Sequence, residues 1–294
     1  MRPNRTNKSP LVFRQPLHLL AALLFILCVE QPSLASDFEP RGLQFSYGLN
    51  LGGYKASDET GNYYNGSGRN NLAETLMRQH TYNRIREALG YDFEFPGEPH
   101  EYLPQNMGYS PAMVVGVFGT LHFNERYSLQ AEFNFTRLRL QDQFLLRILR
   151  GDPGFIGHDI ERFNIMGTEE RSDIRIGLQR TFPLTEQQVH PYLEAGANMI
   201  STRAKENRVQ IAGNRYSILN LTDARYGFRD DGISFGVYAG GGLKMDVGEN
   251  YALLLGAIGN YANINLGDND KYHMHYSIFL RLFLNTGTGI SVAD

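Results

Sequence analysis

The chain lacks several features that would place it in common protein classes. Its 294 residues include no tryptophan, a single cysteine and no apolar run of about 20 residues, the length that a membrane-spanning helix requires. A helical membrane protein is therefore disfavoured. The formal net charge of −3 supplies no basic surface for nucleic acid. Glycine (31 residues), phenylalanine (18) and tyrosine (17) are abundant, and this mixture favours β-structure.

The N-terminal segment, residues 1–35, has the organisation of a secretory signal peptide. Basic residues open it, an apolar segment of residues 17–29 follows, and Ser33-Leu34-Ala35 supplies small residues at a cleavage site. We predict cleavage after Ala35 and export from the cytoplasm. Because Cys28 lies in this segment, the mature chain has no thiol. Disulfides, thiolate catalysis and cysteine-ligated zinc are thereby excluded.

Eight segments of the remaining chain alternate apolar side chains with polar or small ones. They fall at residues 43–51, 115–123, 127–136, 174–182, 192–199, 233–245, 251–261 and 272–284. A period of two predicts β-strands, and each run is about as long as a tilted strand that crosses a bilayer. The connections alternate between short turns and long segments (55–110, 141–170 and 202–232), as in bacterial outer-membrane barrels.

These patterns predict an all-β fold, an eight-stranded antiparallel up-and-down transmembrane β-barrel with long extracellular loops. We assign residues 36–284 to the barrel and residues 285–294 to a periplasmic C-terminal tail. The alternative is a soluble barrel with its apolar face inward. The leader, the unequal loops and the glycines on the polar face favour the membrane.

Several stretches also resemble a known family. They are residues 127–132 (YSLQAE), 172–182 (SDIRIGLQRTF), 190–196 (HPYLEAG) and 235–243 (FGVYAGGGL). Together they resemble PorT-like (OmpA-like) outer-membrane β-barrel proteins of the Bacteroidota type. The resemblance implies an eight-stranded barrel, and some relatives belong to a protein-secretion apparatus. Its motifs mark strands and turns rather than an active site, and the first long loop departs from the family pattern.

The polar face of the predicted strands would line the barrel lumen. An eight-stranded barrel is filled by side chains, so buried charges there must pair. We predict a lumen polar network that comprises Glu132, Arg175, Glu194, Lys244, His273, His275 and Arg281. Such a network can be a gated ion path or a structural plug, and the plug is favoured.

Two small motifs suggest other chemistry. His275 and Ser277 share one strand face, so a carboxylate such as Glu132 or Glu194 could complete a nucleophilic site similar to that of outer-membrane lipid A deacylases. His273 and His275 could bind a metal, but no third ligand is evident. We predict no catalytic residues, no metal and no cofactor.

The long loops carry two predicted helices. Asn71 can cap a helix that ends at Gly90, with Glu74 at a capping-box spacing. The second helix is expected at Phe144–Leu149. Loops of this length and composition are usually functional, which suggests a protein partner bound through residues 55–110, 141–170 and 202–232.

The leading hypothesis is a non-enzymatic protein of the bacterial outer membrane, embedded in its lipid, whose loops bind a protein partner in secretion or surface assembly. The second is a narrow porin-like channel for ions or small solutes. The third is a lipid-modifying enzyme.

Overall fold

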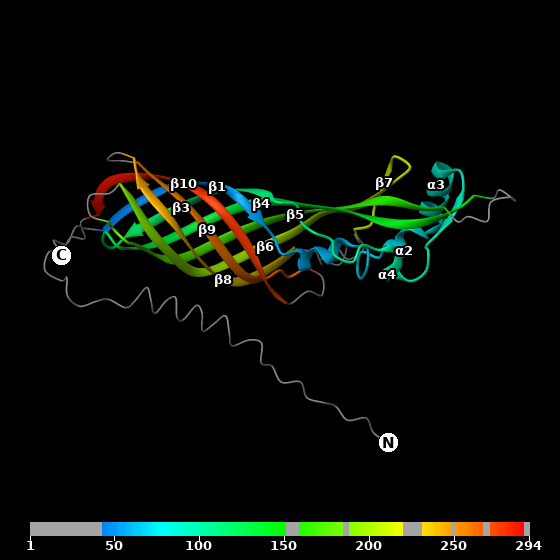
Figure 1. Ribbon diagram of the computed structural model, residues 1–294, viewed down its shortest axis with the longest axis horizontal. Coiled ribbons are helices and arrows are strands. Elements are labelled where there is room, and N and C mark those ends of the chain that lie inside the picture. Colours follow the sequence, from blue (N-terminus) through cyan, green and yellow to red (C-terminus); the bar gives the residue numbers. More distant parts are fainter. Residues whose placement is uncertain are drawn as a thin grey trace, which may run out of the picture.

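Eight antiparallel strands close into a ring (Figure 1). The computed structural model describes residues 43–150, 159–184, 188–219, 231–247, 251–266 and 271–290, and the predicted signal peptide lies outside these ranges. The ring strands are β1 (Leu43–Lys55), β3 (Ala112–His122), β4 (Tyr127–Leu149), β5 (Asp159–Thr181), β6 (Val189–Ile211), β8 (Asp231–Asp246), β9 (Tyr251–Asn263) and β10 (Tyr272–Ile290). Each pairs with its neighbour in chain order, and β1 closes the ring by pairing with both β3 and β10. The predicted fold class is confirmed.

The outward face of the ring is apolar. Exposed side chains on it include Leu49 and Leu51 on β1, Val115 and Val117 on β3, Ile174, Ile176 and Leu178 on β5, and Ile278, Leu280 and Leu282 on β10. At the end of the barrel with the short turns, the Arg180 guanidinium lies 5.5 Å from the ring centre of Tyr127 and 5.0 Å from that of Phe182. Aromatic and basic side chains at the edge of an apolar band are typical of a membrane interface.

Strands β4, β5 and β6 are much longer than a membrane requires. Each has 23 residues, whereas about 9–11 residues of tilted strand cross a bilayer. Their second halves leave the barrel as an extended sheet, which projects to the right in Figure 1. Much of the predicted loops 141–170 and 202–232 is therefore strand.

The two faces of these strands exchange polarity along their length. On β4, inward residues change from polar (Glu132, Asn134) to apolar (Leu138, Leu140), while outward residues change from Phe135 to Arg137. The first arrangement suits lipid outside and a polar lumen inside. The second suits water outside and an apolar core, so the exchange near Thr136 marks where the chain leaves the membrane.

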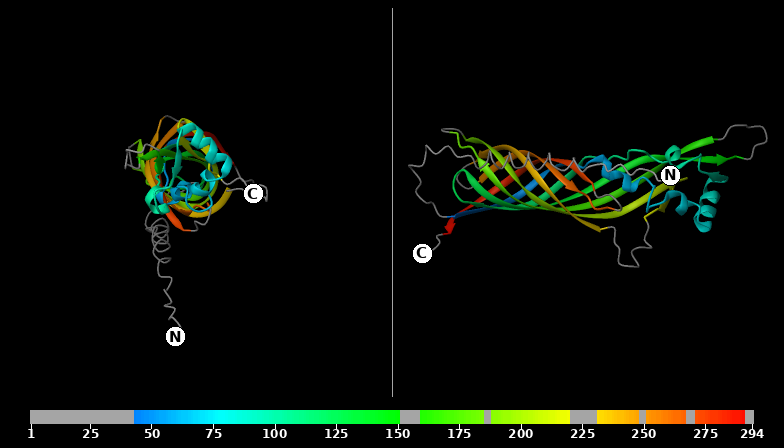
Figure 2. Two further views of the ribbon diagram at one scale, coloured as in Figure 1. Left: turned by 90° about the vertical axis from the view of Figure 1, so that its right-hand side faces the viewer. Right: turned by 90° about the horizontal axis from the view of Figure 1, so that it is seen from below.

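Beyond this exchange the chain forms a folded cap. We define the cap as residues 56–110, β7 (Asn214–Ser217) and the parts of β4, β5 and β6 beyond Thr136, Arg171 and Thr202. Residues 56–110 form η1 (Asp58–Tyr64), α2 (Leu72–Leu76), α3 (Gln79–Leu89), β2 (Asp92–Glu94) and α4 (Pro99–Tyr102), which lie over the barrel mouth and along the sheet (Figure 2). No helix in the described ranges is long and apolar enough to cross a membrane.

The cap has an apolar core of its own. Side chains from η1, the helices and the projecting sheet meet there with almost no exposed surface. They include Tyr64, Leu72, Leu76, Ile85, Phe93, Leu138, Leu140, Phe144, Leu146, Ile165, Val209 and Ile211. This core explains why the sheet persists outside the membrane, since isolated strands are at best marginally stable in water.

The helix in the first long segment starts and ends as predicted but is broken in the middle. The Asn71 side chain accepts a hydrogen bond of 3.0 Å from the Glu74 backbone N–H, and Gly90 ends α3 with a φ of 75°. Between them, α2 ends at Leu76 and α3 begins at Gln79. The Glu74 carboxylate pairs with Arg78 at 3.1 Å rather than closing a capping box.

The helix predicted at Phe144–Leu149 is wrong, because these residues continue β4. Residues 144–148 pair with β5, and residues 147–149 pair with β2. Phe144, Leu146 and Ile148 point into the cap core, whereas Leu149 is exposed. Apolar residues on both faces of this short strand hid its period of two. The chain end also differs from the sequence boundary, because β10 runs past residue 284 to Ile290.

We predict opposite outcomes for one charge placed on either side of the polarity exchange. Ile176→Arg puts a charge on the lipid face of β5 and should lower the free energy of unfolding by about 2–4 kcal/mol. Gln141→Arg, on the outward face of β4 in the cap, should change it by less than about 0.5 kcal/mol. Because the chain has no tryptophan, unfolding in lipid vesicles would be followed by far-ultraviolet circular dichroism. Equal effects of the two substitutions would contradict the assigned boundary.

Candidate functional site

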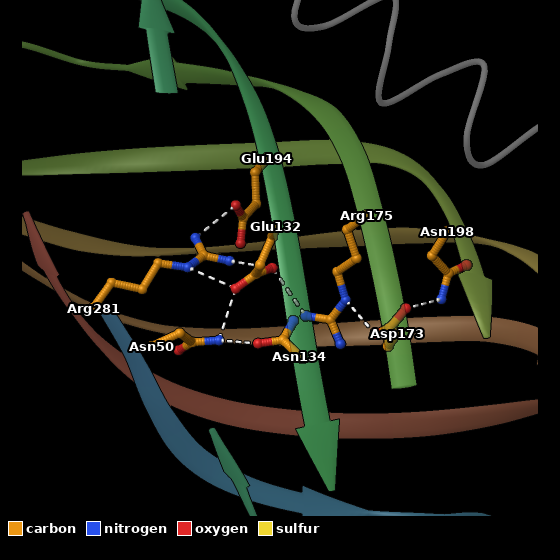
Figure 3. A network of polar contacts seen from close by, with 8 residues as sticks. All are labelled: Asn50, Glu132, Asn134, Asp173, Arg175, Glu194, Asn198 and Arg281. Atoms are coloured by element: carbon orange, nitrogen blue, oxygen red, sulfur yellow. Dashed lines mark hydrogen bonds and ion pairs between the residues drawn. The ribbon is translucent and has the colours of Figure 1, made fainter. Parts of the chain in front are cut away.

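The lumen of the barrel holds a buried polar network, which we call the lower cluster (Figure 3). Its members come from five ring strands, β1, β4, β5, β6 and β10, because the inward positions of neighbouring strands meet across the narrow interior. They are Asn50, Glu132, Asn134, Asp173, Arg175, Glu194, Asn198 and Arg281.

Arg281 joins two carboxylates at the centre of this cluster. Its Nη1 donates to Glu194 Oε2 at 2.9 Å, and its Nη2 donates to Glu132 Oε2 at 3.1 Å. All three side chains are essentially without exposed surface. A charge buried to this extent is tolerated only when opposite charges and hydrogen bonds surround it.

Arg175 forms the second half of the cluster. Its Nε donates to Asp173 Oδ2 at 2.6 Å and its Nη1 to Glu132 Oε2 at 3.4 Å, so Glu132 links the two arginines. Asn50 Nδ2 donates to Glu132 Oε1 at 2.7 Å. Asn198 Nδ2 donates to Asp173 Oδ1 at 3.3 Å. Three carboxylates and two guanidinium groups thus bind β1, β4, β5, β6 and β10 together through the lumen.

Aromatic side chains fill the lumen around the lower cluster and between it and the short turns. The rings of Phe118 and Phe283 meet edge to face with centres 4.5 Å apart. The Arg281 guanidinium lies 3.9 Å from the centre of the Phe279 ring. Cation–π contact of this kind stabilises a charge where water is absent.

A second network, the upper cluster, connects the barrel to the cap. It comprises Tyr54, Thr60, Tyr64, Tyr109, Glu169, Arg171 and His275. Tyr64 and Tyr109 donate to Glu169 Oε2 at 3.2 and 2.7 Å, and Arg171 Nε donates to Glu169 Oε1. Because both tyrosines belong to residues 56–110 and Glu169 to β5, these bonds fasten η1 and the segment before β3 to the sheet.

The two cap tyrosines remain donors over the whole physiological pH range. Burial, and then the nearby Glu169 carboxylate, hold the pKa of the Tyr64 and Tyr109 hydroxyls well above the ordinary value for tyrosine. Their stabilising contribution is therefore fully present below about pH 10 and is lost only as the pH rises through the raised pKa.

The space between the two clusters is small. A cavity of about 10 Å³ is lined by Tyr54, Asn134, Arg171, Asp173 and Arg175, among others. This volume suffices for about one water molecule. At this level the lumen is filled by side chains, as expected for eight strands.

The structure brings together four of the seven residues that the sequence placed in one network. Glu132, Arg175, Glu194 and Arg281 meet in the lower cluster. Lys244 lies instead near the short-turn end, partly exposed, and pairs with Asp246 at 3.2 Å. His275 belongs to the upper cluster.

Among the members that the sequence reasoning did not name are the three remaining charged residues of the two clusters and Asn50. Asp173, Arg171 and Glu169 continue the inward face of β5 beyond Arg175, and Asn50 follows Gly48 on β1. A strict period of two extended from Arg175 would have found the first three, but the apolar outward residues that signalled the strand stop at Ile174.

The hydrogen-bond partners of His273 and His275 differ from those that a catalytic serine or a metal site would require. His275 Nδ1 accepts a 3.0 Å hydrogen bond from the Ser57 backbone N–H, which leaves the proton of the neutral ring on Nε2. A serine base needs the opposite tautomer, oriented by a carboxylate. His273 Nδ1 lies 3.1 Å from the Glu59 carboxylate. Among the described residues, no three histidine, cysteine or acidic side chains are grouped to hold a metal ion.

Comparisons with known proteins find similar architectures only among solved structures. No family model matches the chain, and no curated protein matches its sequence. Neisserial surface protein A is 13% identical with a TM-score of 0.40, covering 83% of this chain and 98% of its own. OprG from Pseudomonas aeruginosa is 11% identical with a TM-score of 0.37, covering 84% and 94%. Ail of Yersinia pestis, in complex with the heparin analogue sucrose octasulfate, is 11% identical with a TM-score of 0.32, covering 82% and 98%.

The chain's own geometry defines its class. A closed antiparallel ring with apolar side chains outward, polar side chains inward and unequal connections at its two ends is the architecture of outer-membrane proteins. The protein is a membrane-spanning β-barrel of this type. The narrower PorT-like assignment stays a prediction.

Removing the central cation should destabilise the barrel strongly. Arg281→Met leaves Glu194 buried without its cation and Glu132 with Arg175 alone, and should lower the free energy of unfolding by about 3–5 kcal/mol. Lys244→Met breaks a partly exposed pair at the barrel end and should cost less than about 1 kcal/mol. Adding Glu132→Gln and Glu194→Gln to Arg281→Met should restore part of the loss. Equal effects of the two single substitutions, measured by circular dichroism in micelles, would contradict the central role of Arg281.

Breaking the upper cluster should loosen the cap and leave the barrel closed. Glu169→Gln removes the charge that faces Arg171 and should accelerate proteolysis within residues 56–110 at least tenfold, since breaking a buried pair costs about 3–5 kcal/mol. The exposed pair of Glu161 and Arg150 provides the control, and Glu161→Gln should leave the cleavage rate within about twofold. Cleavage rates would be compared by mass spectrometry of the fragments. An intact cap in Glu169→Gln would show that the upper cluster does not fasten it.

Proposed function

We propose that this protein is a non-enzymatic outer-membrane barrel whose cap binds a protein partner outside the cell, as a component of a secretion or surface-assembly complex. The observation that supports this most directly is the folded cap. Three strands extend about twice as far as the membrane requires, and residues 56–110 complete an apolar core around them. A barrel that served only as a membrane anchor would need neither feature.

The filled lumen favours this proposal over the alternative of a channel for ions or small solutes. Arg281, Glu132 and Glu194 occupy the middle of the barrel with at most about 1% of each side chain exposed. Above them, the upper cluster and η1 lie across the mouth. A path for ions or solutes would require these paired charges to separate, which leaves each of them desolvated and unpaired.

The distal end of the cap is the surface we assign to the partner. Apolar side chains are exposed where β2, β4 and β5 meet: Tyr91 (44%), Leu149 (39%) and Ile160 (51%). Leu149 pairs with Asp92, next to Tyr91, and Ile160 pairs with Arg147 two residues before Leu149. Rigid backbone pairing therefore holds these three side chains within one region, and we call them the tip residues.

Surface substitutions test this assignment better than a large deletion. Removing residues 60–105 would take Tyr64, Leu72, Leu76 and other core residues with it and would expose Leu138 and Leu140. The tip residues are exposed, so their replacement should leave folding unchanged.

A photo-crosslinking amino acid at the tip should trap the partner in living cells. We expect one discrete adduct from positions 149 and 160. We expect none from position 141, where the exposed Gln141 lies on β4 nearer the membrane. Combined replacement of Tyr91, Leu149 and Ile160 by serine should reduce co-purification of that partner at least tenfold, because each anchor lost from an interface costs about 1–2 kcal/mol. Adducts of equal yield at Gln141, or none at the tip, would contradict the proposal.

A further inference from the structure

A group of cations lies on the outward face of the barrel just beyond the apolar band. Arg137 and Arg139 project from β4, and Arg203 and Lys205 project from β6. All four side chains are exposed. We call these four residues the cation patch.

Strand register places the patch along the boundary of the membrane. Phe135 pairs with Ser172, which pairs with Ser201, and this rung carries the last outward phenylalanine of β4 and two hydroxyl groups. Two residues further along each strand, Arg137 pairs with Glu170, which pairs with Arg203. Neighbouring rungs on one face are about 7 Å apart, and the outer strands of three are about 10 Å apart. The patch therefore begins within one side-chain length of the lipid-facing residues.

The patch carries a surplus of positive charge. Glu170 lies between Arg137 and Arg203 in the rung and pairs with Lys205 at 3.3 Å. The next acid outward on β6, Glu206, is paired with Arg208 at 3.2 Å. Within the described part of the chain, no ion pair joins Arg137 or Arg139 to a carboxylate. On its other side Arg203 lies opposite Asp231 of β8 in the strand register, so the surplus of positive charge is carried by Arg137 and Arg139, at the level of the lipid headgroups.

A cation at the corresponding end of another ring strand is held by the cap. Lys55, at the corresponding end of β1, donates to Asp58 at 2.7 Å and to the Tyr109 carbonyl at 2.6 Å, and so is held by the cap. The patch is confined to β4 and β6, two of the three strands that continue into the cap.

We propose that the cation patch is a binding site for the phosphate groups of lipids in the leaflet beside the cap. Guanidinium groups bind phosphate oxygens in pairs of parallel hydrogen bonds, and the Ser172 and Ser201 hydroxyls can complete the donor set. The acyl chains of the same lipid would lie against Phe135 and Ile174, which are exposed on the apolar face directly below. Bound lipid would hold the membrane surface against the β4–β6 side of the barrel and thereby fix the direction in which the cap projects.

The test compares lipids that differ in phosphate content. The full-length mature protein in neutral detergent would be titrated with diphosphoryl lipid A, monophosphoryl lipid A or phosphatidylethanolamine, and bound lipid counted by native mass spectrometry. We expect affinity to fall in that order. The combined Arg137→Gln and Arg139→Gln substitutions should weaken diphosphoryl lipid A binding roughly twentyfold, since one cation near an anionic lipid surface is worth about fivefold.

Matched controls separate this site from general electrostatics and from misfolding. Arg162→Gln removes an exposed outward arginine of β5 further into the cap and should leave lipid binding unchanged. Circular dichroism and heat-dependent gel mobility should show the double variant folded, because Arg137 and Arg139 point away from the protein. The proposal would be overturned if the Arg162 variant and the double variant lost lipid affinity equally. It would also be overturned if the double variant bound lipid as tightly as the unaltered protein. Full competition by excess inorganic phosphate would do the same, because it would indicate a site for a free anion.

Discussion

The structure depends on a change of solvent along three continuous strands. Within the membrane, β4, β5 and β6 must present apolar residues outward and satisfy polar groups inward, because lipid offers no hydrogen bonds. Beyond the membrane the same strands are surrounded by water, and the apolar residues move to the inside. The exchange between Phe135 outward and Leu138 inward occurs without a break in the ladder between β4 and β5, while the ladder between β5 and β6 shifts register close by, between Thr168 and Glu169. One sheet is therefore both a barrel wall and the base of a water-soluble domain.

The lower cluster follows from the first half of this constraint. A ring of eight strands has no room for bulk water, so its inward polar side chains must satisfy one another. Arg281 and Arg175 do so through the shared Glu132, with Glu194 and Asp173 on either side. Since these groups come from strands far apart in the sequence, their pairing also fixes the relative positions of the strands. The lumen thus acts as a polar core that holds the ring strands together.

The upper cluster lies where the two environments meet. Glu169 and Arg171 are the last charged inward residues of β5 before the apolar core of the cap, and they receive hydrogen bonds from Tyr54, Tyr64 and Tyr109 or donate to them. On the outside, the cation patch occupies the same stretch of chain. Polar contacts on both faces of the sheet therefore mark the membrane boundary, one set directed to the protein and the other, by our proposal, to lipid.

The sequence by itself determined the number of ring strands, their direction and the identity of the lipid-facing side chains. A period of two needs only the nearest neighbours of each residue, and eight runs with alternating connections define the ring. It also placed Glu132, Arg175, Glu194 and Arg281 inside. Only the tertiary structure decided where the strands end, that Phe144–Leu149 is strand, and that Lys244 and His275 lie away from the central network. The physical reason is that these outcomes depend on what surrounds each face of a strand. Where lipid gives way to water, the apolar residues move from the outward face of the strand to the inward face. The apolar pattern of the lipid face therefore ends at Ile174, although β5 itself extends back to Asp159.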